Sequence, residues 1–312
     1  MEKEYSKDRL LDLTAHFERR KQYASEKIKH LREQHEICFA LSGLTFSKSP
    51  YIFEGIGVLR EVLYPPGEIE LAAALKNKSL LSPIARHMPA LTHELALQCC
   101  NSTLQQTELN IGWWILSAIR CRTLIEVLVP AVANVSWDVF PAMNSNSCEV
   151  QLLEDVPATR RIDTVKELSL EALDWVQQYL ENWITLLEFP AFRLAIDSLT
   201  THNQHANLRM SAAALWAGIE ALFGINSELR FRLALMAAAY LEERGVQRLE
   251  TYRRIKKLYD YRSKAVHGGV TSDHHLVEHI IEVRKLLSQL VCRMTELGRM
   301  PTVEDYEERL LT

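Results

Sequence analysis

The hydrophobic pattern is most regular in the second half of the chain, where apolar residues recur at alternating steps of three and four. One such series is Leu173, Val176, Leu180, Trp183 and Leu187. This spacing places the apolar side chains on one face of an α-helix. Gly224, Gly245 and Gly298 follow later segments of the same kind, and a glycine in this place commonly ends a helix. The pattern predicts helices over residues 163–187, 191–199, 208–223, 228–244, 249–267 and 273–297, the first capped by Asp163 and the last by Asp273.

The first half is less regular. Residues 3–36 are rich in charged side chains with few apolar ones, which predicts a long and mostly solvated helix. Residues 37–44 and 51–58 favour strands, and Pro65-Pro66-Gly67 is a strong break. Further helices are expected at residues 68–75, 91–100 and 104–129, with short strands around Val135 and Val150.

These elements predict a mainly α protein of two parts. Residues 1–155 are expected to form a mostly helical region with a few short strands, of unassigned role. Residues 156–312 are expected to form a helical domain. The boundary falls near residues 155–163, where Pro157 precedes a polar run.

Composition narrows the class of protein. Of 312 residues, 47% are hydrophobic and 24% charged, which is typical of a globular domain. A formal net charge of −4 excludes a broadly basic surface, so an anionic partner needs a local patch. The start of the chain lacks the apolar run of a signal peptide, and no stretch reaches the roughly 18 apolar residues of a membrane span. Six scattered cysteines without a Cys-x-x-Cys pair indicate free thiols. We expect a cytoplasmic protein with no membrane contact.

The local patch lies between residues 248 and 264, where seven basic residues stand against two acidic ones. On a helix, Arg254, Lys257 and Tyr261 share one stripe, while Ile255, Leu258 and Arg262 share another. Such a surface suits a phosphate backbone. The expected RNA-binding residues are Arg253, Arg254, Lys256 and Lys257.

Arg262 and His267 close this basic segment, directly before Gly268 and Gly269. A fixed cation near a titratable imidazole suits chemistry on a phosphodiester. Residues five apart differ by about 140° around a helix, so the two side chains converge only at a helix end or across two chains. A histidine before two glycines is also a good helix cap with no chemistry, and such an arginine is often a structural ion-pair partner.

Two other groups of polar residues bear on this site. Glu220 lies among apolar neighbours and needs a partner, for which Arg230, Arg232 and Arg262 are the candidates. His275 and His279 have the i, i+4 spacing of a metal pair, and His274 adjoins them. No third ligand is obvious, although Asp273 and Glu278 are close in sequence. No metal and no cofactor are expected.

Three segments resemble the HEPN domain, more narrowly the Apea-like HEPN family of bacterial defence proteins. Residues 215–224 (LWAGIEALFG) resemble its first core helix and residues 228–235 (ELRFRLAL) its second. Residues 258–269 (LYDYRSKAVHGG) match its Arg-x4–6-His signature. The resemblance covers about residues 160–300.

The resemblance implies a C-terminal helical bundle that dimerises and acts as a metal-independent endoribonuclease. Arg262 would stabilise the phosphorane and His267 would transfer a proton, with Ser263, Lys264 and Glu220 in supporting roles. Many active members carry Asn, Asp or His after the arginine, where this chain has Ser263. The implied partners are RNA, with tRNA as a candidate, a second copy of the chain, and a regulatory protein or phage-derived trigger. The alternative is an inactive module for dimerisation, RNA binding or partner binding.

Overall fold

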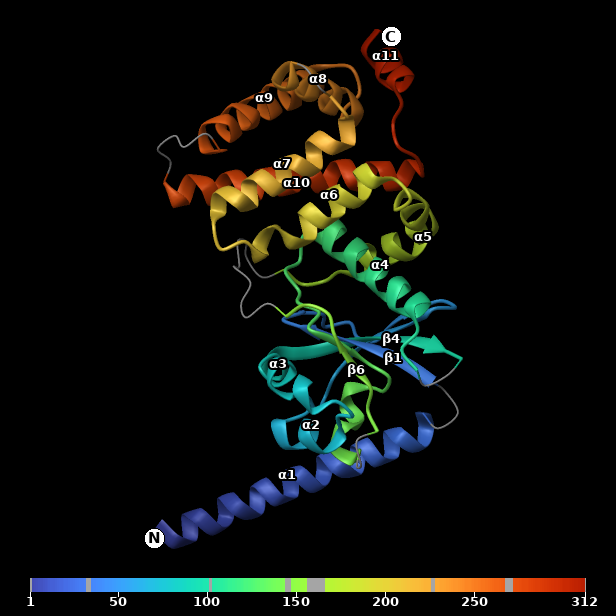
Figure 1. The fold of residues 1–312 in the computed structure, drawn as a ribbon, viewed down its shortest axis with the longest axis vertical. Coiled ribbons are helices and arrows are strands. Elements are labelled where there is room, and N and C mark those ends of the chain that lie inside the picture. The colour runs from blue at the N-terminus through green and yellow to red at the C-terminus, as the bar shows by residue number, and fades with distance from the viewer. Residues whose placement is uncertain are drawn as a thin grey trace. The chain divides into compact units, whose positions relative to one another are not determined.

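The computed structural model describes residues 2–31, 35–100, 103–143, 147–155, 166–225, 228–266 and 272–311 (Figure 1). The expected helix cap Asp163 lies outside these residues. The chain divides into two compact units. The first unit contains residues 1–113 and 127–155, and the second contains residues 114–126 and 156–312. Residues 114–126, which we expected in the first region, therefore belong to the second unit.

The first unit is built on a six-stranded sheet in the order β2-β3-β4-β1-β5-β6. Every neighbouring pair of strands in it is antiparallel. The strands are β1 (His35–Ser42), β2 (Tyr51–Phe53), β3 (Gly57–Glu61), β4 (Leu91–Cys99), β5 (Ala131–Ala133) and β6 (Val150–Leu152).

The predicted fold class, a HEPN-like helical bundle joined to a mostly helical region, is wrong. We expected a mostly helical N-terminal region with a few short strands beside an all-helical bundle, whereas the protein combines 64% helix with a sheet that takes up 13% of the residues. The clearest error concerns residues 91–100, predicted as a helix, which form β4 in the centre of the sheet. The β4 residues from His93 to Leu97 are all buried. A strand buried on both faces loses the alternating pattern that would reveal it.

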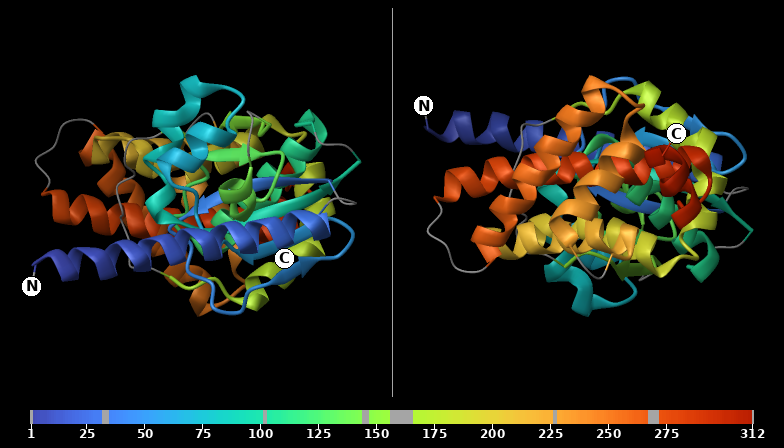
Figure 2. Two further views of the ribbon diagram at one scale, coloured as in Figure 1. Left: turned by 90° about the horizontal axis from the view of Figure 1, so that it is seen from below. Right: turned by 90° about the horizontal axis from the view of Figure 1, so that it is seen from above.

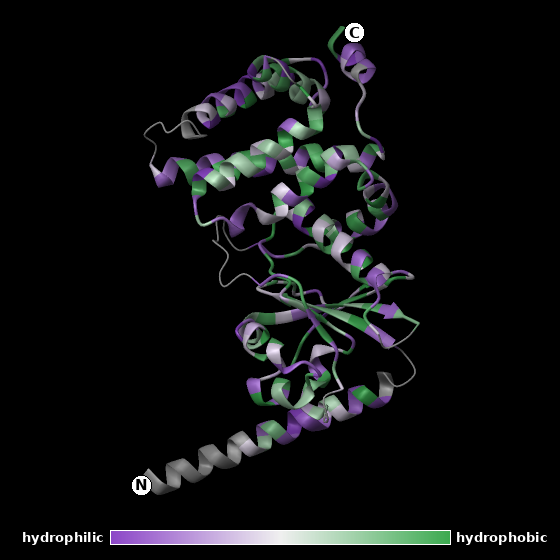
Figure 3. Cartoon of the chain, viewed as in Figure 1, coloured by the Kyte–Doolittle hydropathy of each residue, from purple (hydrophilic) through white to green (hydrophobic). Residues whose placement is uncertain are grey.

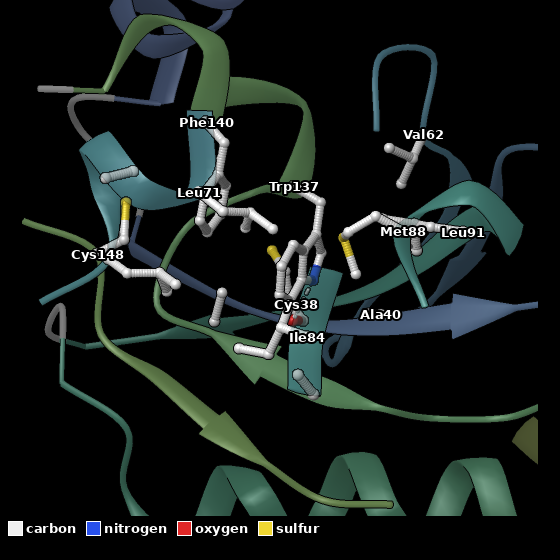
Figure 4. Packing of buried hydrophobic residues seen from close by; sticks show 14 of the residues in the cluster. Cys38, Ala40, Val62, Leu71, Ile84, Met88, Leu91, Trp137, Phe140 and Cys148 are labelled. Carbon is white, nitrogen blue, oxygen red and sulfur yellow. Dashed lines mark hydrogen bonds between the residues drawn. The ribbon is translucent and has the colours of Figure 1, made fainter. Parts of the chain in front are cut away.

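Small helices cover one face of this sheet. The helices α2 (Glu68–Ala74) and α3 (Leu81–Ala85) and the 3-10 helix η3 (Trp137–Ala142) enclose a core with the strands. Figure 4 shows Trp137 among Cys38, Met88 and Leu71, with Phe140 nearby. The Trp137 and Phe140 rings are stacked with centroids 5.0 Å apart, and Trp137 Nε1 donates a 3.0 Å hydrogen bond to the Cys38 carbonyl. The long α1 (Glu2–Leu31) packs on η3, and the short 3-10 helices η1 (Lys78–Leu80) and η2 (Met88–Ala90) lie between α2 and β4 in the chain.

The described residues of the second unit are helical. The helix α4 (Gln106–Thr123) contributes its second half. The others are α5 (Leu170–Leu186), α6 (Pro190–Thr201), η4 (His202–Gln204), α7 (Leu208–Phe223), α8 (Leu229–Leu241), α9 (Val246–Val266), α10 (Asp273–Leu297) and α11 (Val303–Leu311). Figures 1 and 2 show α7 and α10 side by side, and α6 and α9 also pack on α7.

Two of the three helix ends expected at glycines are found, but α8 ends at Leu241 with Glu242 as its C-cap, before Gly245. The helix expected from residue 163 begins at Leu170 and is capped by Ser169. Gly224 and Gly298 cap α7 and α10 in the left-handed conformation, at φ of 59° and 68°. The cap at the start of α10 is Ser272, whose hydroxyl accepts from the amide of His275, and not the expected Asp273. In Figure 3, α7 is coloured mainly hydrophobic and α9 mainly hydrophilic, as their central and outer positions require. In the part of the chain described, no helix has the length and apolar character needed to cross a membrane.

Candidate functional site

Arg262 lies on α9 with its guanidinium turned toward α7. Its Nη2 is 3.2 Å from Oε1 of Glu220, and each of the two side chains is 23% exposed. The guanidinium also lies 5.4 Å from the centre of the Tyr259 ring. Burial, followed by the charge of Glu220, raises the pKa of Tyr259. Of the three arginines considered as partners for Glu220, Arg262 is the one that pairs with it. Arg230 instead pairs with Asp260.

The structure describes less of the other signature residues, Ser263, Lys264 and His267. Ser263 is exposed on α9. The backbone of Lys264 belongs to α9, which spans residues up to Val266, but its side chain is outside the described part. His267 lies outside the described residues altogether. The geometry of the Arg262–His267 pair therefore stays a prediction.

The basic residues of α9 fall into two groups. Arg254 and Lys257 line an open groove between α9 and α10, and Tyr261 lines it one turn further on. This confirms that Arg254, Lys257 and Tyr261 share a stripe. Arg253 and Lys256 do not line the groove. Arg253 is exposed, and the Lys256 ammonium lies 5.5 Å from the centre of the Tyr252 ring.

The groove has a volume of about 640 Å³. Its remaining wall residues are Leu258, Asp260, His275, Glu278, His279 and Glu282. Basic side chains come from the α9 wall, whereas Glu278 and Glu282 come from α10. Opposite charges of the two walls approach each other where Arg254 Nη1 is 3.9 Å from Glu282 Oε2.

His279 is the most deeply buried polar residue of this groove, with 5% of its surface exposed. Its Nε2 is 3.0 Å from Nε1 of Trp216. An indole N–H can only donate, so Nε2 must be the acceptor and the proton of the neutral ring must be on Nδ1. The His279 Nδ1 is buried and has no hydrogen-bond partner among the described residues. Burial lowers the pKa of His279 to about 4, so the ring is neutral at physiological pH.

The proton on His279 Nδ1 argues against the metal pair that the spacing of His275 and His279 suggested. A metal at Nδ1 of His279 would require a lone pair on that nitrogen as well as on Nε2, which a neutral imidazole does not have. Possible ligand atoms instead gather at His274, His275 and Glu278, within 4.8 Å of one another, on three exposed residues. They lie in the first turns of α10, where the helix dipole disfavours a cation.

A second polar cluster, not anticipated from the sequence, lies in the first unit. Glu94 of β4 is fully buried. It accepts hydrogen bonds from Arg60 Nε at 2.7 Å, the Ser136 hydroxyl at 2.7 Å and the Trp137 amide at 2.8 Å. Arg60 also binds Glu36 through both terminal nitrogens, at 2.6 and 3.1 Å.

The Glu94 cluster extends to α1 through Lys27. The Lys27 ammonium is 2.9 Å from Asp138 and 3.7 Å from Glu94. Burial by itself would raise the pKa of Glu94, but the charges of Arg60 and Lys27 and the hydrogen bonds from Ser136 and Trp137 together hold that pKa below its usual value. Because the Glu94 carboxylate is already bonded by three donors, this cluster holds α1 and η3 on the sheet and does not present a reactive group.

Comparisons with known proteins add no relative. Searches against protein-family models, curated proteins and solved structures found no match for this chain.

Proposed function

We propose that the protein is a metal-independent endoribonuclease of the cytoplasm, and that its second unit cuts RNA with Arg262 and His267. The observation that carries the proposal is the setting of Arg262. It is a half-buried cation, oriented by Glu220, on the same helix as two basic residues that line an open groove. The resemblance of residues 258–269 to the HEPN signature supports the same assignment.

The chemistry follows from the two side chains. The substrate 2′-oxygen attacks the adjacent phosphorus, a phosphorane forms, and the bond to the 5′-oxygen breaks. The guanidinium of Arg262 stabilises the added negative charge of the phosphorane. His267 accepts the 2′-hydroxyl proton or donates one to the leaving 5′-oxygen, and water exchanges the other proton. The products are a 2′,3′-cyclic phosphate and a 5′-hydroxyl.

A second copy of the chain belongs to this proposal. On a continuous helix, residues five apart such as Arg262 and His267 would differ by about 140°. A dimer would therefore bring the two kinds of side chain together more readily than one helix does. The first unit then serves as the recognition part, which a regulatory partner or phage-derived trigger engages.

A non-catalytic module is the second candidate, and one observation favours it. The charge of Arg262 is already balanced by Glu220 at 3.2 Å, which is the arrangement of a structural ion pair. In that case the second unit binds RNA, a partner or its own copy without cutting RNA.

The deciding experiment compares wild type, Arg262→Ala and His267→Ala on total RNA and on tRNA, all in EDTA. Arg193→Ala is the charge-matched control, because Arg193 is exposed on α6. We expect wild type and Arg193→Ala to cut RNA and the other two variants to lose cutting. Cutting that survives His267→Ala, or that EDTA abolishes in wild type, contradicts the proposal. If wild type and all the variants bind RNA but none of them cuts it, the second candidate is supported.

Oligomeric state gives an independent check. Light scattering at micromolar concentration should give the mass of a dimer. A strict monomer that still cuts RNA would contradict a site shared between two chains.

A further inference from the structure

The groove between α9 and α10 contains a hydrogen-bond donor with no acceptor. His279 is 95% buried, its Nε2 is occupied by Trp216, and its Nδ1–H has no partner in the described part of the chain. A buried donor left unpaired destabilises the folded protein. Because His279 lines the groove, a ligand acceptor that reaches this covered nitrogen after a small shift of the neighbouring side chains would remove that destabilisation.

The surroundings of His279 indicate the shape of the ligand. The Tyr261 ring lies 4.7 Å from the His279 ring, centroid to centroid, and both residues line the groove together with Leu258. Two rings and an aliphatic side chain form a surface suited to a flat, partly apolar group. The donor beside them suits a flat group with a ring nitrogen or carbonyl acceptor.

Charge indicates what is attached to that flat group. Arg254 and Lys257 stand one turn apart on the α9 wall, in line with Tyr261, while the carboxylates of Glu278 and Glu282 stand on the α10 wall. Asp260 also lines the α9 wall, but its charge is paired with Arg230. An anion attached to the ligand is therefore attracted to the α9 side and repelled from the α10 side.

We propose that this groove binds one unpaired nucleotide of an RNA strand, with the base beside Tyr261 accepting from His279 Nδ1–H and the phosphate on Lys257 and Arg254. The inference rests on the proposed function, because it gives the RNA substrate a second point of attachment on the helix that carries Arg262. It predicts a preference for single-stranded over fully paired RNA, because a paired base cannot leave its stack without a cost of a few kcal/mol.

The chain provides matched controls for the two cations. Lys257→Ala is compared with Lys256→Ala, and Arg254→Ala with Arg253→Ala, since each pair removes the same charge from neighbouring positions and only one member lines the groove. The probe is a short fluorescein-labelled single strand with 2′-fluoro groups, which has no 2′-hydroxyl and cannot be cut. Binding is measured by fluorescence anisotropy over a range of salt concentrations.

We expect Lys257→Ala and Arg254→Ala to weaken binding about tenfold or more, and their neighbours about twofold through the general loss of charge. The slope of log affinity against log salt should fall by about 0.7 in the groove variants, the value for one phosphate contact on a single strand. Equal losses within each pair would overturn the inference.

The base contact is tested separately. Tyr261→Ala should weaken binding about fivefold or more, the usual effect of losing one stacked base, and the same probe with abasic residues should bind wild type no better than the intact probe binds Tyr261→Ala. In histidine-labelled protein, the Nδ1–H resonance of His279 should move downfield when the intact probe binds. An abasic probe that binds as tightly as the intact one, or polyglutamate that competes equally well, overturns the nucleotide assignment.

The two proposals fail in different ways. If RNA cutting depends on Arg262 while the matched pairs bind alike, the groove assignment alone is wrong. If the groove variants behave as expected but wild type never cuts RNA, the nuclease proposal alone is wrong.

Discussion

Buried polar side chains are satisfied differently in the two units. Glu94 in the first unit is enclosed by a donor set drawn from Arg60, Ser136 and the Trp137 amide. His279 in the second unit is almost as deeply buried but has a partner at only one of its two nitrogens among the described residues. A fully bonded buried group specifies structure, whereas a buried donor that lacks an acceptor indicates where a ligand can bind.

Glu94→Ala should destabilise the first unit strongly. The change leaves Arg60 and Lys27 without their shared counter-charge and leaves the buried Ser136 hydroxyl and Trp137 amide without an acceptor. Breaking a buried ion pair on one side costs about 3–5 kcal/mol. Urea unfolding followed by tryptophan fluorescence measures the loss. Glu61→Ala is the control, because Glu61 is exposed on β3, and a loss for Glu94→Ala as small as the control's would contradict a role in holding the sheet.

The second unit should lose stability in mild acid. Burial lowers the pKa of His279 to about 4, and burial and then Arg284 lower that of His202 to about 4. Both lie below the usual value of about 6.5, so between pH 6.5 and 4 the unfolded state binds more protons than the native state. The free energy of unfolding must therefore fall as pH decreases through this window, by about 3 kcal/mol for each residue.

The variant His279→Gln tests this pH dependence. It cannot titrate but can still accept from Trp216, so it should flatten the pH profile by roughly half, since His202 remains. Unfolding curves between pH 7 and 4 give the profile, and NMR titration of the histidine rings assigns each pKa. A His279 ring that titrates near 6.5 would rule out the buried, neutral form.

At the level of whole elements, those determined by local sequence were predicted well, and those determined by tertiary contacts were not. The long helix at the start was predicted at 3–36 and found at Glu2–Leu31, because its charges at helical spacing are a local signal. The helix predicted at 91–100 is a strand, because its backbone pairs along both edges with β1 and β3, which lie elsewhere in the chain. The pattern of residues 91–100 alone cannot distinguish these cases.

The candidate site follows the same rule. The stripe of Arg254, Lys257 and Tyr261 could be predicted because it depends only on the geometry of one helix. The pairing of Glu220 with Arg262 could be narrowed to three candidates but not decided. The position of the proton on His279 depends on Trp216, which is 63 residues away, so no local sequence pattern could predict it.

Glu220→Gln tests the pairing of α7 with α9. Both side chains of the ion pair are partly exposed, so removing one charge should cost less than about 1 kcal/mol of stability. On the proposed function, RNA cutting should fall by about tenfold or more, because Arg262 loses the carboxylate that orients it. Urea unfolding and cutting rates are measured together. Asp305→Asn is the control. It removes one charge from another partly exposed ion pair, the pair of Asp305 with Arg299, and both of these residues follow α10 in the sequence. Equal cutting by the two variants would mean that Glu220 does not position Arg262.

At the scale of the whole molecule, each of the two units is made of two separate segments of the chain. Residues 114–126 belong with the C-terminal helices, although residues 127–155 return to the sheet. Within the second unit, this segment supplies the partners of α10. Arg284, with 2% of its side chain exposed, donates to Glu126 at 2.7 Å and to the Leu124 carbonyl at 2.6 Å. Ser288 donates to the Cys121 carbonyl at 2.6 Å. A C-terminal unit defined by sequence alone, starting at residue 156, would lack these groups.

A fragment of residues 156–312 should therefore be markedly less stable than the same unit in the full chain. It loses the ion pair of Arg284, the acceptor of Ser288, and the contact of the Arg122 guanidinium with the Trp175 ring, whose centre is 5.1 Å away. Together these should lower the free energy of unfolding by at least about 3 kcal/mol. Circular dichroism during urea unfolding measures the difference. A synthetic peptide of residues 106–126 should restore stability in proportion to the logarithm of its concentration, as a ligand that binds only the folded state does. The same peptide with Glu126→Ala should restore less. A fragment that unfolds at the same urea concentration with and without the peptide would show that this segment does not stabilise the helical unit.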